Sequence, residues 1–256
     1  MVSFAAEPIV FLGKFGVTNT LLNTLFVDAM IIGLIIAVNK QISLVPGRLQ
    51  LLTESLLTGF YQITESVAGE NTKKIFPFVV SFFLFILFAN WSGLIPGISA
   101  IGIKEEGHIV PLLRPATSDF NATLALALVS IGATHILSIN TIGIKDYLSR
   151  FFSLNPINLF IGFLEIISEI TKVISLSFRL FGNIFAGEIV LGTVSTIFAF
   201  IFPLPFLMLE FVVGLVQALV FSMLTMAFMA ILMTPHQNAD MATGPDGPLV
   251  QGEVNH

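Results

Sequence analysis

Long apolar runs, separated by short polar stretches, recur along the chain between residues 21 and 233. A helix rises about 1.5 Å per residue, so about 20 apolar residues span a hydrocarbon core about 30 Å thick. On this basis the pattern predicts several membrane-crossing segments. They are residues 21–38, 75–95, 120–139, 157–202 and 204–233. We therefore expect an all-α polytopic membrane protein with a single membrane domain over residues 1–233.

The last two apolar segments are longer than an upright span requires, and no turn signal appears between residues 163 and 201. Tilting is one way for a helix to accommodate excess hydrophobic length. We therefore expect two long, strongly tilted helices that form a hairpin and are joined at Phe202–Pro205.

Two other stretches have a different pattern. After the break at Pro46-Gly47, apolar residues recur at helical spacing with polar residues between them. This predicts an amphipathic helix over residues 48–66 that lies on the membrane surface. Residues 234–256 are rich in Gly, Pro, Asp and Asn, and we expect them to form a flexible tail on the inner side of the membrane.

Composition supports the membrane assignment and excludes several other classes. The chain is 55% hydrophobic and only 11% charged, whereas a soluble domain carries about 25% charged residues. A soluble protein of this composition would lack the polar surface it needs. The absence of cysteine excludes disulfides, thiolate nucleophiles and cysteine-based metal sites. No basic cluster indicates nucleic-acid binding.

The distribution of basic residues predicts the orientation of the chain, because inner loops carry more Lys and Arg. With the N-terminus outside, the inner segments carry Lys40, Arg48, Lys73, Lys74, Lys145 and Arg150. The outer segments carry Lys14, Lys104 and Arg114. We therefore expect the N-terminus outside and the C-terminal tail inside.

The remaining basic residues, Lys172 and Arg179, lie inside an apolar segment. A charge at the centre of a bilayer costs at least about 2.5–3.5 kcal/mol, and such residues usually face a protein interior or a water-filled cavity. No carboxylate lies one helical turn from Arg179 in either direction. Its partner is therefore expected from elsewhere in the fold or from another subunit.

A helical wheel at about 100° per residue places other polar residues relative to Arg179. Several fall within about 80° of Arg179 on that wheel: Glu165, Ser168, Glu169, Lys172, Ser175 and Asn183. Glu188 falls on the opposite side, about 180° away. In the last apolar segment, Glu210 and Gln217 lie close to one line along the helix.

This arrangement predicts two separate wet regions. One follows Glu165, Ser168, Glu169 and Lys172 toward the inner side, and the other is formed by Glu188 and Glu210 toward the outer side, with Arg179 near the junction. Two carboxylates placed close together are suited to exchanging protons.

Purely structural roles are also open for these polar residues. Polar residues in membrane helices often only form hydrogen bonds with neighbouring helices, and Glu165 or Glu169 has the spacing for a structural ion pair with Lys172. His135, inside the third apolar segment, either lines the inner path or bonds a neighbouring carbonyl group. Asp119 is suited to cap the helix that follows it.

The stretch "SLSFRLFGNIFAGE", followed by "LVQALVFSMLTMAFMA", resembles subunit a of rotary F-type ATP synthases, called subunit 6 in mitochondria. "VPGRLQ", "FANWSGLIPG" and "RPATSDFNATLALAL" resemble further signatures of this family in the expected order. The resemblance covers about residues 18 to 233. It implies a chain that holds two long tilted helices against a ring of c subunits.

The resemblance also implies roles for individual residues. Arg179 would attract the ring carboxylate and block proton leakage between two half-channels. Asn183 and Gln217 would lie near it. Glu188 and Glu210 match the outer half-channel, where family members often have a histidine at one of the two positions. Glu165 and Ser168 match the inner half-channel, to which we also assign Glu169, Lys172 and His135.

The family implies partners and a location as well. The partners would be the c-subunit ring, the peripheral-stalk b subunits and the soluble ATPase sector, all in the context of a lipid bilayer. No cofactor, metal or catalytic site is expected within this chain, which has no P-loop motif. A bacterial plasma membrane is the expected location, with a mitochondrial inner or thylakoid membrane as the alternative.

Two other classes of function are compatible with a polytopic membrane chain. A stand-alone transporter or channel also buries charges near the midplane, often at broken helices or inverted repeats, and neither feature is visible here. An intramembrane enzyme would need a motif such as HExxH or GxSxG, and the sequence contains neither.

Overall fold

The chain is almost entirely helical in the part that the structure, a computed structural model, describes. That part comprises residues 8–12, 15–40, 42–43, 46–95, 102–105, 108–151, 156–197 and 203–234. Its α-helices are α1 (Asn19–Lys40), α2 (Arg48–Ala68), α3 (Thr72–Ser92), α4 (Phe120–Ile142), α5 (Ile144–Phe151), α6 (Pro156–Ile197) and α7 (Pro203–Met233). Short 3-10 turns are η1 (Gly69–Asn71) and η3 (Ala116–Ser118).

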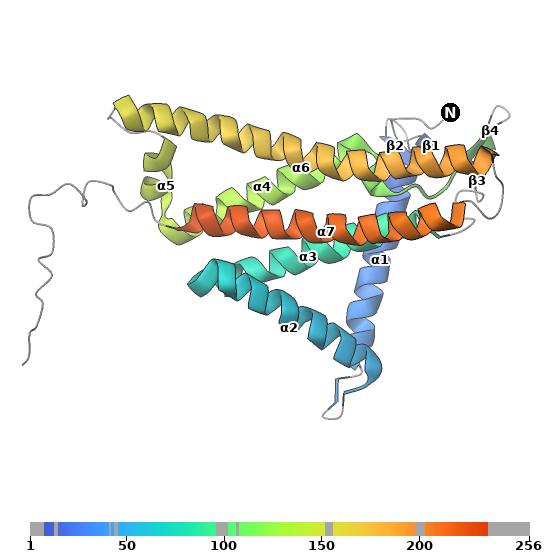
Figure 1. Cartoon of the computed structure of the whole chain (residues 1–256), viewed down its shortest axis with the longest axis horizontal. Helices are drawn as coiled ribbons and strands as arrows, with labels where there is room; N and C mark the ends of the chain where they lie inside the picture. The colour runs from blue at the N-terminus through green and yellow to red at the C-terminus, as the bar shows by residue number, and fades with distance from the viewer. Residues whose placement is uncertain are drawn as a thin grey trace, which may run out of the picture.

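The two longest helices, α6 and α7, run side by side along the long axis of the molecule (Figure 1). α4 packs against both of them, α3 packs mainly against α7, and α1 crosses the bundle at a steep angle. Both α6 and α7 exceed the length of an upright span. The region that would join them, residues 198–202, lies outside the described residues.

The described helices include four stretches that are long and apolar enough to cross a membrane: Asn19–Lys40, Arg48–Ser92, Phe120–Ile142 and Pro203–Met233. Together with the helical architecture, they confirm the prediction of an all-α polytopic membrane protein. The predicted tail is outside the described residues from position 235 onward.

Two short β-hairpins were not predicted. β1 (Pro8–Leu12) pairs with β2 (Phe15–Thr18), and β3 (Gly102–Glu105) pairs with β4 (His108–Pro111), both antiparallel. Strands of four or five residues are too short to show a clear alternation of apolar and polar positions. Both hairpins lie toward the end of the molecule where α6 ends and α7 begins (Figure 1).

Polar contacts and close packing hold α7 against its neighbours. Asn90 of α3 donates to the carbonyl of Gly214 at 3.0 Å. A Cβ atom at Gly214 would lie 3.1 Å from the Cβ atom of Asn90, so a larger residue would require the two helices to move apart by a few tenths of an ångström. Ser130 of α4 hydrogen-bonds Thr225 of α7 at 2.8 Å. Such contacts are typical of helices that pack within a membrane.

The amphipathic helix α2 is attached to the bundle through aromatic contacts. The ring of Phe60 lies 4.6 Å from that of Phe83 of α3, and the ring of Tyr61 lies 5.3 Å from that of Phe76. These aromatic residues of α2 therefore pack on α3, whereas Leu52 and Ile63 of the same helix are exposed. The position of α2 on the membrane surface stays a prediction.

Asp119 caps the N-terminus of α4, as its sequence position predicts. Its backbone is extended, and its carboxylate accepts a hydrogen bond from the backbone N–H of Asn121 at 3.0 Å. The hydroxyl group of Thr20 in α1 also donates to it at 3.4 Å. The same carboxylate thus starts α4 and links α1 to it.

Candidate functional site

Arg179 lies on an exposed face of α6. Its guanidinium donates to the hydroxyl of Ser175 at 3.4 Å. Within the part of the chain that the structure describes, no carboxylate forms an ion pair with Arg179. It opens onto a hollow of about 390 Å³ between α6 and α7, here called the arginine hollow, which Ser168, Lys172 and Phe228 also line. A permanent cation is therefore presented to whatever covers this face.

Asn183 and Gln217 form a polar contact between α6 and α7, one helical turn beyond Arg179. The amide of Asn183 donates to the side-chain oxygen of Gln217 at 2.6 Å. Gln217 is buried, and its side-chain nitrogen has no partner among the described residues. The structure thus brings these two predicted residues together close to the arginine.

Glu188 of α6 and Glu210 of α7 line one cavity of about 420 Å³, here called the acidic cavity. A Cβ atom at Gly187 would lie 2.7 Å from a carboxylate oxygen of Glu210, so this glycine leaves the room that Glu210 occupies. The other carboxylate oxygen of Glu210 is buried without a partner among the described residues. This oxygen is placed to accept a hydrogen bond from water or another donor that enters the cavity.

Arg114 is a residue of the acidic cavity's surroundings that sequence reasoning missed. Its side chain is only 6% exposed and its guanidinium lies 3.4 Å from a carboxylate oxygen of Glu188, which is 32% exposed. It also donates to the hydroxyl of Ser118 at 3.0 Å. From the sequence, Arg114 is only an outer-segment cation within the "RPATSDFNAT" signature, and no local pattern links it to Glu188. Glu188 therefore has a cation beside it, which makes it unlike Glu210.

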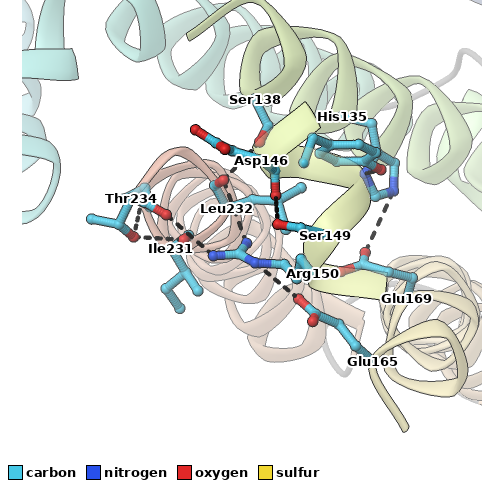
Figure 2. Close-up of polar contacts among 12 residues, drawn as sticks. His135, Ser138, Asp146, Ser149, Arg150, Glu165, Glu169, Ile231, Leu232 and Thr234 are labelled. Atoms are coloured by element: carbon cyan, nitrogen blue, oxygen red, sulfur yellow. Dashed lines mark hydrogen bonds and ion pairs between the residues drawn. The ribbon is translucent and has the colours of Figure 1, made fainter. Parts of the chain in front are cut away.

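A second polar cluster gathers around α5 (Figure 2). In Figure 1, α5 lies at the end of the molecule opposite to that where α6 ends and α7 begins. Glu169 of α6 is buried, and the ammonium group of Lys172 lies 2.7 Å from one of its carboxylate oxygens. The imidazole of His135 in α4 lies 3.6 Å from the other oxygen. Of the structural ion pairs considered from the sequence, the pair between Glu169 and Lys172 is therefore present.

His135 makes a second contact on its other nitrogen. Its Nδ1 atom lies 2.9 Å from the phenol oxygen of Tyr147 in α5. Burial raises the pKa of the Tyr147 phenol, and the carboxylates of Glu169 and Glu165 raise it further. The phenol therefore keeps its proton, and its hydrogen bond with Nδ1 runs in the direction that the tautomer of the imidazole sets. The partners of His135 are thus a phenol and a carboxylate.

Arg150 of α5 connects the ends of α6 and α7 (Figure 2). Its Nε atom lies 3.6 Å from the carboxylate of Glu165, and its terminal nitrogens donate to the carbonyls of Leu232 at 3.4 Å and Thr234 at 3.2 Å. A cation at a helix C-terminus is favourable, because the last carbonyls have no partner within the helix. Arg150 therefore positions Glu165 and caps α7.

The polar stripe that the wheel predicted on α6 divides between two environments. Ser168 is exposed and lines the arginine hollow with Lys172. Glu165 and Glu169 instead face the cluster around α5, where Arg150 and His135 contact them. Lys172 joins the two regions, since it lines the hollow and also pairs with Glu169.

Comparison with known proteins identifies related sequences over most of the chain. The family model described as ATP synthase A chain matches residues 21–230. The chain is similar to ATP synthase subunit a of Moorella thermoacetica, at 31% identity over 88% of this chain and 95% of that protein. It is also similar to ATP synthase subunit a of Syntrophobacter fumaroxidans, at 34% identity over 81% of each chain. A third relative, ATP synthase subunit a of Citrifermentans bemidjiense, is 35% identical over 78% of this chain and 82% of that protein.

Proposed function

Because the chain belongs to the ATP synthase A chain family, we propose that α6 and α7 form the stationary side of a rotary proton path in an F-type ATP synthase. The chain is an integral membrane protein that takes part in proton transport and ATP synthesis as part of that complex.

Arg179 is the residue that faces the moving partner. The observation that carries the proposal is its exposure on α6 without a carboxylate partner among the described residues, on a face with large exposed apolar side chains. Phe178 and Ile174 of that face are 56% and 50% exposed. An apolar face with one fixed cation fits a ring of c subunits in which each subunit presents one membrane carboxylate. Arg179 attracts that carboxylate when it loses its proton and prevents direct proton leakage.

Two half-channels meet near Arg179. The acidic cavity with Glu188 and Glu210 is the outer half-channel, through which protons reach the ring. The inner half-channel lies on the side of the cluster around α5, and its members are Glu165, Ser168, Glu169, Lys172 and His135. Glu169 and Glu188 are separated by about 28 Å of α6 at about 1.5 Å per residue. The contact between Asn183 and Gln217 lies between them, beside the arginine.

The outer half-channel differs from family members with a histidine, because both of its titratable positions are carboxylates. Water and two carboxylates therefore carry the proton there. The peripheral-stalk b subunits and the soluble ATPase sector complete the assembly. The N-terminus lies outside and the C-terminus inside, in a bacterial plasma membrane.

Single cysteines test the outer half-channel directly, since the chain has no cysteine of its own. We expect Glu188→Cys and Glu210→Cys to react with a membrane-impermeant maleimide or with silver ions added from the outer side. Ala218→Cys is the matched control, because Ala218 is fully buried in α7. Complete lack of reaction at both positions, in assembled complexes, would contradict an outer path through this cavity.

Arg114→Gln tests whether the newly found cation matters to Glu188. We expect ATP-driven proton pumping to fall about tenfold, because hydrogen bonds to charged groups contribute about 1.5–3 kcal/mol and partial exposure of Glu188 favours the low end. Pumping by inverted vesicles measures this effect. In the background of Glu188→Gln, the Arg114 substitution is expected to add little. Fully additive losses would show that Arg114 acts independently of Glu188.

A further inference from the structure

A groove of about 260 Å³ lies between α1 and α4, and it shares no lining residue with the arginine hollow or the acidic cavity. We call it the α1–α4 groove. Besides α4, its wall is formed by Thr24 of α1, Phe85 of α3, Ala116 and Thr117 of η3, and Leu180 of α6. The groove therefore lies where α1 leaves the bundle that the other helices form (Figure 1).

The wall that α4 supplies is a continuous helical face. Ala122, Ala125, Leu126 and Val129 line the groove, and their spacing of three and four residues places them on one side of the helix. This face extends over about 10 Å at about 1.5 Å per residue. The two alanines have small side chains, which leave the space that the groove occupies. The groove is thus elongated along α4.

The groove opens onto an apolar surface. Val129 lines it and is 61% exposed, and the neighbouring Leu128 and Leu25 are 54% and 57% exposed. Both α1 and α4 are long and apolar enough to cross a membrane. The mouth of the groove therefore lies at the depth of the hydrocarbon core of the bilayer.

One end of the groove is close to the boundary of the membrane. The hydroxyl of Thr20 in α1 donates to the carboxylate of Asp119, which caps α4, at 3.4 Å. The two helices therefore begin at the same level. Thr117 lies just before this cap, whereas Val129 lies further along α4 toward the middle of the span. Thr117 is thus at the end of the groove where the interfacial region of the bilayer begins.

Thr117 carries a hydroxyl that the rest of the described chain does not satisfy. It is buried, and its oxygen has no hydrogen-bond partner among the described residues. The other two threonines of the lining differ from it. Thr24 donates to the carbonyl of Thr20 at 2.9 Å, and Thr123 donates to the carbonyl of Phe120 at 3.0 Å. Because an unpaired buried hydroxyl is unfavourable, an acceptor that enters this end of the groove would be stabilised.

These features together select the kind of molecule that fits the groove. An empty groove deprives its apolar lining of dispersion contacts, and water is a poor occupant because an apolar wall offers it few hydrogen bonds. We propose that the α1–α4 groove binds one acyl chain of a membrane lipid, and that the ester carbonyl of this chain accepts a hydrogen bond from Thr117. The inference requires only that the chain lies in a bilayer, so it does not depend on the proposed function.

The test uses the assembled complex in vesicles of phosphatidylethanolamine and phosphatidylglycerol, with a phosphatidylethanolamine probe that carries a diazirine in one acyl chain. The complex is illuminated either in these vesicles or after transfer to lipid-free detergent, and mass spectrometry locates the attached probe. In detergent we expect label to persist between Ala122 and Val129. Label at Ile136, which is 61% exposed on the same helix outside the groove, should be lost with the surrounding lipid.

Two substitutions probe the two parts of the site. Thr117→Val keeps the shape and removes the hydroxyl, and it is expected to lower the retained label about 2- to 12-fold, the usual worth of one hydrogen bond. Ala125→Leu fills the groove and is expected to lower the retained label about tenfold. Leu128→Phe enlarges an exposed neighbour outside the groove and is the matched control, with no change expected.

Each contrary result overturns a defined part of the inference. Loss of the groove label together with the Ile136 label in detergent would show that only surrounding lipid reaches α4. Unchanged retention in Thr117→Val would overturn the hydrogen bond, and unchanged retention in Ala125→Leu would overturn the site itself. A groove that takes no label even in vesicles would show that polypeptide covers it, either from other residues of this chain or from another subunit.

Discussion

Replacing Arg179 by alanine is expected to lower ATP-driven proton pumping at least about 100-fold, because the substitution removes the fixed charge that, in the proposed mechanism, the passing ring carboxylate meets. The fold should survive. Arg179 is exposed, and the one hydrogen bond found for it within the described chain is a long contact with Ser175. The measurement is acidification of inverted vesicles on addition of ATP, together with the amount of complex in the membrane.

The matched control for this experiment is Arg48→Ala. Arg48 is an exposed basic residue at the start of α2, outside the arginine hollow and the acidic cavity, and its loss should leave pumping close to the unmodified rate. Normal coupled pumping by the Arg179→Ala variant would contradict the role of this residue. Poor assembly of that variant would contradict the statement that its contacts within the chain are minor.

Glu210→Gln is expected to lower proton pumping about 100-fold, since a positioned acid–base group contributes about 10²–10⁴-fold to proton transfer. The amide has nearly the same size, so the packing against Gly187 is kept, but the side chain can no longer accept and release a proton. Glu70→Gln provides the control, because Glu70 is an exposed carboxylate in η1, away from the acidic cavity.

The expected difference between the two cavity carboxylates sharpens this second prediction. Glu188 has Arg114 beside it, whereas the buried oxygen of Glu210 has no partner among the described residues. Glu210 is thus the carboxylate that we expect to exchange its proton with water and with the ring. A Glu210→Gln variant that pumps at the unmodified rate would assign proton transfer to Glu188 alone.

Helix formation could be predicted well from the sequence, because apolar runs of membrane length leave few alternatives. α6 is the clearest case, since no turn signal interrupts it and it extends over Pro156–Ile197. The cap at Asp119 was also predictable, because it depends only on neighbouring residues. The two β-hairpins, β1–β2 and β3–β4, could not be predicted, because each strand is too short to show an alternation of apolar and polar residues.

The partners of the polar residues could not be predicted, because they depend on contacts between distant segments. A helical wheel places Glu169 and Lys172 correctly relative to each other, and the two pair at 2.7 Å. It contains no information about Arg150, which reaches Glu165 from α5, or about Tyr147, which holds His135 from the same helix. Arg114 escaped notice for the same reason, since its contact with Glu188 spans 74 positions.

Disulfide cross-linking between Phe178→Cys and a cysteine placed beside the ring carboxylate tests the central claim most directly. Phe178 is next to Arg179 and is 56% exposed, whereas Leu180, the site of the control Leu180→Cys, is fully buried. In the assembled complex, we expect a cross-link between the ring cysteine and Phe178→Cys, and none with Leu180→Cys. The absence of any product at position 178, in complexes that contain both chains and still pump protons, would contradict the claim that Arg179 faces the ring.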